Sequence, residues 1–191
     1  MPTRVGVFGG SFDPPHLGHL LAATAAFETL GLDLVLWVPT GDQSHKASTS
    51  AAHHRLEMVR LATAGEARFA VSTVDIDREG PTYSIDTVTD LRGLYSDAEF
   101  TFLLGDDAWA GIDSWHRSSE LTSLVQFAVL SRTTVATEAE AESLRWVRIP
   151  RIEMSSTECR ERVRAGQGLR YRVPDSVAEY IENHKLYLEG A

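Results

Sequence analysis

Short apolar segments recur along the chain, and each is rich in β-branched and aromatic side chains. Their length is that of a buried strand, and Gly, Pro or Asp commonly flanks them. The pattern predicts strands at Val5 to Phe8, Leu34 to Val38, Phe69 to Val74, Phe100 to Leu104, Phe127 to Leu130 and Trp146 to Ile149.

Segments with helical spacing lie between the first five predicted strands. The spacing predicts helices at Leu17 to Leu30, Ala51 to Ala64 and Ser84 to Leu94, with shorter ones near Asp107 to Ala110 and Ser119 to Leu124. Strands that alternate with helices form βαβ units, so we expect an α/β fold with a Rossmann-like, doubly wound parallel sheet. Such sheets bind ligands at the carboxyl ends of their strands, where the strand order reverses.

The last third of the chain differs from this alternation. The interval Ser131 to Leu144 is polar and acid-rich, so we expect a surface loop or a short helix there. Two further helices are predicted at Ser156 to Ala165 and Asp175 to Asn183, the second begun favourably by Pro174. With 191 residues, the chain is expected to form a single domain, 1–191, with a helical C-terminal subregion at about 155–191.

Composition narrows the partners and the compartment. The formal net charge of −9 argues against a general nucleic-acid-binding protein, although arginines concentrate between Arg145 and Arg172. The chain carries no apolar run near the ~18 residues that span a bilayer, so we expect a cytoplasmic protein without a membrane partner. One cysteine, Cys159, cannot form an internal disulfide, which suits a reducing compartment and inert packing.

The stretch GGSFDPPHLGH, from Gly9 to His19, directly follows the first predicted strand. Its two glycines let the backbone approach a ligand closely, and a helix that begins near His16 would point free N–H groups at an anion. His16 and His19 are three residues apart and could reach one polyphosphate together. Gly18 costs a helix ~1 kcal/mol relative to alanine, which makes sense if something packs flat against it.

Other interpretations of this stretch stay open from the residues alone. A single histidine is more often a structural, hydrogen-bonded residue than a catalyst. A metal pair ranks low, because metalloprotease histidines sit at i and i+4 around a glutamate, and we predict no metal ligands in the protein. The chain has neither GxxxxGK[ST] nor GxGxxG, which excludes a P-loop ATPase and the dinucleotide-binding fingerprint.

A second motif, MSSTECR, stands near the other end of the chain. Ser155 and Glu158 fit a capping box, so the hydroxyl residues are expected at a helix N-terminus, and capping alone would explain them. Arg160 would then lie in the first helical turns, where its planar fork suits paired phosphate oxygens.

Together the two motifs resemble the signature of the nucleotidylyltransferase superfamily. Its HxGH motif is matched by His16, Gly18 and His19, and its SSTxxR motif by Ser155, Ser156, Thr157 and Arg160. Within the superfamily, nearly the whole chain is similar to the bacterial nicotinate mononucleotide adenylyltransferase family. The supporting segments are Lys46 in SHK, GPTYSIDT from Gly80, GDDAW followed by SWHR, and YRVPDSVAEYI from Tyr171.

This resemblance implies adenylyl transfer in NAD biosynthesis. The phosphate of nicotinate mononucleotide would attack the α-phosphorus of ATP, so that pyrophosphate leaves and deamido-NAD forms. Since that nucleophile is already an anion at neutral pH, the protein would align the reactants and neutralise charge rather than supply a base. The resemblance also implies Mg2+ carried with ATP and held mostly by phosphates and water. Whether the chain forms a homo-oligomer stays open.

The resemblance assigns the site as well. Catalytic roles are implied for His16, His19, Lys46 and Arg160. Contacts with ATP are implied for Gly9, Gly10, Ser11, Phe12, Gly18, Gly105, Asp107, Ser155, Ser156 and Thr157. Nicotinate mononucleotide would be held by Ser84, near the ring carboxylate, and by Trp115, stacked on the ring. The structural alternatives are helix capping for Asp107 and core packing for Trp115.

Two departures from the family pattern bear on specificity. The loop from Gly41 to His45 lacks the paired prolines often seen before the lysine. Asp106 adds an acid beside Asp107, close to where an anionic substrate would dock. Asp106 leaves open a nicotinamide mononucleotide adenylyltransferase and a nucleotide sensor without turnover. A phosphopantetheine adenylyltransferase is a further alternative.

Overall fold

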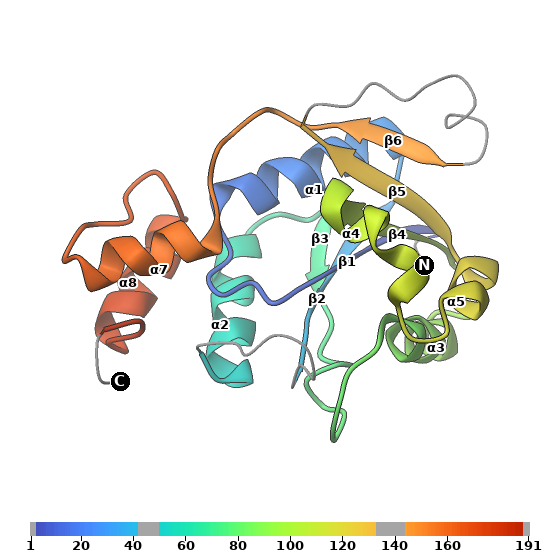
Figure 1. The fold of residues 1–191 in the computed structure, drawn as a ribbon, viewed down its shortest axis with the longest axis horizontal. Coiled ribbons are helices and arrows are strands. Elements are labelled where there is room, and N and C mark those ends of the chain that lie inside the picture. The colour runs from blue at the N-terminus through green and yellow to red at the C-terminus, as the bar shows by residue number, and fades with distance from the viewer. Residues whose placement is uncertain (1–2, 42–49, 133–143, 189–191) are drawn as a thin grey trace.

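The computed structural model describes residues 3–41, 50–132 and 144–188. Within them, six parallel strands form one sheet in the order β3-β2-β1-β4-β5-β6, seen at the centre of Figure 1. The strands are β1 (Arg4–Gly10), β2 (Leu34–Pro39), β3 (Phe69–Val71), β4 (Glu99–Gly105), β5 (Gln126–Ser131) and β6 (Arg145–Arg148). The strand order reverses at β1, which lies between β2 and β4.

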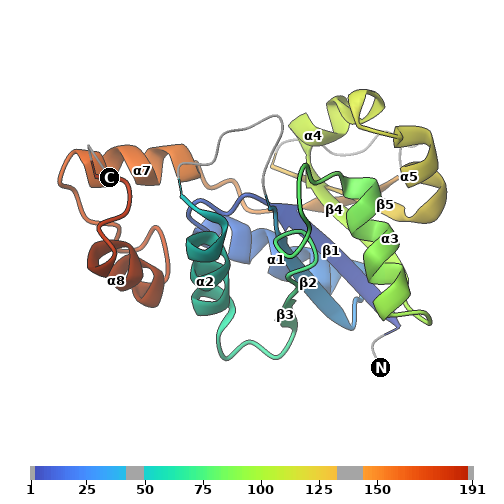
Figure 2. The same cartoon turned by 90° about the horizontal axis from the view of Figure 1, so that it is seen from below.

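Helices cover both faces of this sheet, as Figures 1 and 2 show from two directions. One face packs against α1 (Leu17–Leu30) and α2 (Ala52–Thr63). The other face packs against α3 (Ser84–Leu94), α4 (Asp106–Ala110), the short 3₁₀ helix η1 (Ile112–Ser114) and α5 (Ser118–Leu124). The prediction of a Rossmann-like, doubly wound parallel sheet is confirmed.

The central strands send alternate side chains to the two faces. Val5 and Val7 join the apolar cluster that includes α3, whereas Phe8 packs in the cluster of α1 with Ala23 and Ala26. The small alanine side chains let α1 lie close to the sheet. Because both faces are covered, the strands have no solvent face, which explains their near-continuous apolar sequences.

A third apolar cluster builds the C-terminal helical part. It packs α7 (Ser156–Arg164) and α8 (Asp175–Asn183) beside α2, on the left of Figure 1. Met58 of α2 meets Cys159 of α7 and Ile181 of α8 in this cluster. Burial raises the pKa of the Cys159 thiol, so this cysteine has the inert packing role that was expected.

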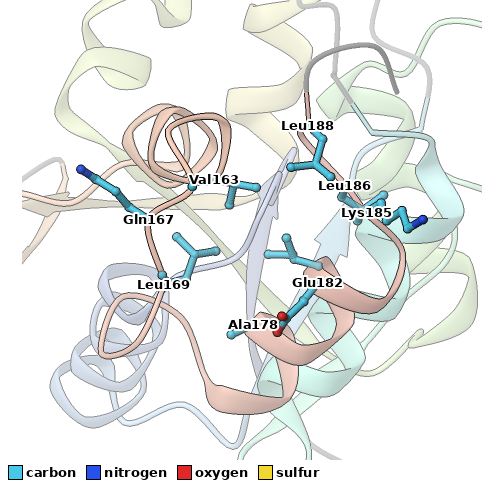
Figure 3. A pocket seen from close by; sticks show the side chains of 11 residues that line it. Val163, Gln167, Leu169, Ala178, Glu182, Lys185, Leu186 and Leu188 are labelled. Carbon is cyan, nitrogen blue, oxygen red and sulfur yellow. The ribbon is translucent and has the colours of Figure 1, made fainter.

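The C-terminal helices also line a cavity of about 270 Å³, shown in Figure 3. Its walls are mainly apolar side chains from α7, from α8 and from the segments that follow each helix. They include Val163, Leu169, Ile181, Leu186 and Leu188. None of the predicted site residues lines this cavity, so the functional site has to be sought at the sheet.

The sequence prediction departs from the structure at the third strand. The expected strand Phe69 to Val74 ends at Val71, because β3 is an edge strand and the chain turns after it. The N–H groups of Ile76 and Asp77 both donate to the carbonyl of Thr73 and close that turn. Residues 133–143, for which a loop or short helix was expected, lie outside the described residues. None of the described helices is long and apolar enough to cross a membrane.

Candidate active site

The GGSFDPPHLGH loop leaves the sheet at the carboxyl end of β1, where the strand order reverses. A cavity of about 250 Å³ opens there and is lined by Gly9, Gly10 and Gly105, among others. Thr40, just after β2, and Ala108 in α4 extend the same wall. The crevice therefore lies at the place where open α/β sheets bind ligands.

The two histidines of the loop stack on each other. Their ring centroids are 3.7 Å apart and their planes meet at 25°. His16 is the N-cap of α1 in an extended conformation, and its backbone N–H donates to Nδ1 of His19 over 3.1 Å. Since Nδ1 accepts, the neutral His19 ring carries its proton on Nε2, which is then a hydrogen-bond donor.

The other loop residues support this pair of rings. A Cβ on Gly18 would lie 3.0 Å from two atoms of the His16 ring, so the group that packs flat against the helix is His16 itself. Phe12 is 2% exposed and meets the His19 ring edge-on at 5.2 Å. Its side chain supports His19, and only its backbone could meet ATP. A Cβ on Gly10 would lie 3.1 Å from the Phe12 ring.

Burial keeps both imidazoles neutral at physiological pH. The pKa of His16 is lowered to about 4, by burial first and then by the positive charge of Arg132. The pKa of His19 is also held well below its usual value, by burial first and then by repulsion from a protonated His16 and from Arg132. Arg132 directly follows β5 and was missed by the sequence analysis. Its position after a predicted strand was the only available signal.

The depressed pKa of His16 makes stability depend on pH. Between pH 6.5 and pH 4 the unfolded chain binds a proton that the folded chain rejects, so stability falls as the pH falls. The contribution of His16 amounts to about 2 kcal/mol of unfolding free energy between pH 8 and pH 5. Thermal melts at the two pH values should therefore differ less for His16→Gln than for the wild type. An equal difference in both proteins would contradict the buried neutral ring.

The second motif forms the N-terminus of α7, as expected. The hydroxyl of Ser155 accepts from the N–H of Glu158 over 3.1 Å, which confirms the predicted cap. The hydroxyl of Ser156 donates to the carbonyl of Pro14 over 2.9 Å. Residues 142 positions apart in sequence thus meet, and the positive end of the α7 dipole faces the GGSFDPPHLGH loop.

Arg160 makes the second link between the two motifs. Its Nη1 donates to the carbonyl of Asp13 over 2.7 Å, and its Nη2 donates to the hydroxyl of Thr157 over 3.2 Å. Its Nε is buried and has no hydrogen-bond partner among the described residues. Arg160 therefore braces the loop and brings a permanent positive charge to it.

Asp13 anchors the same loop from within the protein. Its carboxylate is 3% exposed and accepts from the hydroxyl of Tyr187 over 2.7 Å and from the N–H of Ser50 over 3.3 Å. Tyr187 belongs to the C-terminal cluster, so that subregion holds the loop through Tyr187 as well as through Ser156 and Arg160.

Ser84 and Trp115, predicted to bind the second substrate, come together at one cavity. Its volume is about 400 Å³, and Thr82 lies in the same wall. All three residues also line the crevice at the carboxyl end of β1, so the two cavities adjoin. Trp115 is half-buried and packs edge-on against Phe102 at 6.0 Å, which leaves part of the indole in the cavity.

Two further polar groups, which line the crevice, were missed by the sequence analysis. Asp75 is 3% exposed, accepts from the hydroxyl of Thr87 over 2.7 Å, and has its pKa raised to about 6, mainly by burial. The hydroxyl of Thr82 is buried and has no hydrogen-bond partner among the described residues. An unpartnered buried hydroxyl next to a cavity is suited to meet a ligand.

Comparisons with known proteins agree with this geometry. The model of the cytidylyltransferase-like family matches residues 7–162, which include both motifs. A probable nicotinate-nucleotide adenylyltransferase from Saccharopolyspora erythraea is 47% identical over 191 residues, a match that spans 96% of this chain and 89% of the relative. The chain belongs to the nicotinate-nucleotide adenylyltransferase family. A second probable member, from Mycobacterium bovis, is 43% identical and spans 96% of this chain and 91% of its own length.

Solved structures of nicotinate-nucleotide adenylyltransferases share the fold of this chain. A Plasmodium falciparum nicotinic acid mononucleotide adenylyltransferase complexed with NaAD aligns with a TM-score of 0.79 at 20% identity, over 97% of both chains. A putative nicotinate-nucleotide adenylyltransferase from Vibrio parahaemolyticus aligns with a TM-score of 0.69 at 20% identity, over 98% of this chain and 96% of the other.

Asp106 and Asp107 are the first two residues of α4. Gly105 is the N-cap of α4, so Asp107 is not the N-cap residue and lies in the first turn of the helix. The lining of the crevice includes Gly105 and Ala108 but neither Asp106 nor Asp107, and Asp107 is exposed. Asp106 is therefore not part of the wall on which an anionic substrate would rest.

The family resemblance also implied roles for Lys46 and for Mg2+. Lys46 falls within residues 42–49, outside the described residues, and its role stays a prediction. For the metal, the described residues contain no group of three or more His, Cys, Asp or Glu side chains that could hold an ion.

Proposed function

We propose that this protein transfers the adenylyl group of ATP to nicotinate mononucleotide, which yields deamido-NAD and pyrophosphate. The observation that carries the proposal is the meeting of both motifs at the loop that leaves β1. The glycines of this loop line the crevice together with Ser84 and Trp115, and its two stacked histidines follow a few residues later. Membership of the nicotinate-nucleotide adenylyltransferase family supports the same reaction.

In this proposal the loop and α7 bind the triphosphate. An oxygen of the nucleotide phosphate bonds to the α-phosphorus, and the bond from that phosphorus to the bridging oxygen breaks. Nε2–H of His19 donates to an α-phosphate oxygen as negative charge builds up, and His16 contacts the neighbouring phosphates. Lys46, Arg160 and Arg132 neutralise the departing pyrophosphate. No general base is required, which suits imidazoles that stay neutral at pH 7.

The second substrate would lie in the adjoining cavity. Its ring stacks on Trp115, and its carboxylate meets Ser84 at the first turn of α3, where backbone N–H groups lack intrahelical acceptors. The buried hydroxyl of Thr82 supplies another donor in the same wall. These donors favour a carboxylate over a carboxamide, which supports nicotinate mononucleotide as the substrate.

We also propose that Mg2+ enters with ATP. Since the described residues form no metal cage, phosphate oxygens and water are expected to hold most of its coordination positions. The ion would neutralise charge on the phosphates when bound, and the residues described above act on the remaining phosphate oxygens.

The decisive experiment measures pyrophosphate release from ATP with three acceptors in parallel. We expect kcat/KM for nicotinate mononucleotide to exceed that for nicotinamide mononucleotide by about 100-fold, because the wall of donors leaves the amide unmatched. Phosphopantetheine is expected to give no release above the ATP-only background. Equal values for both pyridine nucleotides would contradict the ring assignment, and no turnover with any acceptor would favour a nucleotide sensor.

A further inference from the structure

Arg55 of α2 is a buried charge that the proposed mechanism does not use. Its side chain is 1% exposed, although the surrounding sequence AHHRLEMVR is polar. Burying a guanidinium is costly unless its N–H groups are hydrogen-bonded, so the contacts of Arg55 call for a specific explanation.

The guanidinium of Arg55 holds three separate backbone segments. Its Nη1 donates to the carbonyl of Ser11 over 3.0 Å, and its Nη2 donates to the carbonyl of Gly41 over 3.1 Å. Its Nε donates to the carbonyl of Ser50 over 3.2 Å. Nη1 also lies 3.5 Å from the hydroxyl of Thr40. These acceptors belong to the loop after β1, the end of β2 and the approach to α2.

Each of the three carbonyls leads to a part of the proposed site. Ser11 lies in the catalytic loop. Gly41 lies against two residues that line the crevice. A Cβ on Gly41 would be 2.2 Å from the carbonyl oxygen of Asp75 and 3.1 Å from the hydroxyl of Thr82. Ser50 is bound from its other side by the carboxylate of Asp13. One guanidinium thus sets the position of the GGSFDPPHLGH loop relative to the cavity that is lined by Ser84 and Trp115.

Arginine is the side chain that suits this task. Its planar fork presents five N–H donors in fixed directions and has no acceptor, so it can bind carbonyls that lie around it in one plane. A lysine ammonium keeps the charge but concentrates its donors at one point, so it cannot span the same three segments.

We propose that Arg55 is a positioning residue for adenylyl transfer. By holding the carbonyls of Ser11, Gly41 and Ser50, it fixes the alignment of the two bound substrates and touches neither of them. This inference rests on the proposed function and extends it to a residue outside both motifs.

The first test is Arg55→Lys, assayed by pyrophosphate release. A small misalignment of reacting groups costs rate, so kcat per folded molecule should fall about 10- to 100-fold. The folded fraction is measured by circular dichroism at the assay temperature, chosen below the melting point of the variant. The matched control is Arg60→Lys on the same helix, where the side chain is 54% exposed and pairs with Glu57 at 3.6 Å. This control should keep the wild-type kcat.

The second test is chemical rescue of Arg55→Ala. Free guanidinium at low concentration should restore part of its kcat, whereas methylammonium should not, and neither should change Arg60→Ala. The proposal is overturned if both Arg55 variants keep the wild-type kcat and KM per folded molecule, since Arg55 would then serve stability alone. It is also overturned if methylammonium rescues as well as guanidinium. If the wild type releases no pyrophosphate, the proposed function fails, and this inference falls with it.

Discussion

Replacing His19 with alanine is expected to lower kcat about 100- to 1,000-fold, because it removes a preorganised donor from the reacting phosphate. The N–H of His16 fixes the tautomer of His19 through Nδ1, so the donor stands ready on Nε2 before ATP binds. The measurement is pyrophosphate release at saturating ATP and nicotinate mononucleotide. KM for the second substrate should change little, because its pocket is built from other residues.

A matched control separates this effect from a general loss of a histidine. His53 is an exposed histidine on α2, outside the crevice, and His53→Ala should keep the wild-type kcat. Melting curves of both variants show whether the fold is kept. Near-normal turnover of His19→Ala would remove the central assumption of the proposed mechanism.

Replacing Arg160 with alanine should reduce kcat/KM for ATP about 100-fold. The change removes a positive charge next to the triphosphate and also releases the carbonyl of Asp13 from α7. Arg160→Lys separates the two effects, because it keeps the charge but cannot bridge Asp13 and Thr157 as the fork does. We expect the lysine variant to lie between the wild type and the alanine variant.

The control for Arg160 is available on the same helix. Arg164 is exposed at the end of α7, and Arg164→Ala should leave kcat/KM for ATP unchanged. One result would change the role that we assign to Arg160. If Arg160→Ala melts at a lower temperature but keeps its kcat/KM for ATP, the guanidinium braces the loop and does not act on phosphate.

The sheet and its helices were predictable because their sequence periods are strong. The spacing gave the bounds of α1, α3 and α8 as the structure has them. The third strand was overestimated, since apolar Val74 extends the pattern past the point where the chain turns. Periodicity reports burial, and a buried turn residue cannot be told from a strand residue by burial alone.

The site was predictable only as far as its motifs reach. The resemblance assigned residues of both GGSFDPPHLGH and MSSTECR to the ATP site, and hydrogen bonds from Ser156 and Arg160 join the two motifs. Arg55, Asp75 and Arg132 were not found, because their positions depend on how distant segments pack. In a single sequence, Arg55 is one more charge on a polar helix, and nothing local indicates that three loops close around it.

Three of the side chains that hold the GGSFDPPHLGH loop have one property in common. Arg55, Ser156 and Arg160 all donate to main-chain carbonyls, at Ser11, Pro14 and Asp13. Such contacts are indifferent to the side chain at the accepting position but sensitive to the number of residues between acceptors. Loop length is therefore the more stringent constraint. An insertion or deletion of one residue here would move several acceptors at once, so a protein engineer should graft this segment whole or leave it untouched.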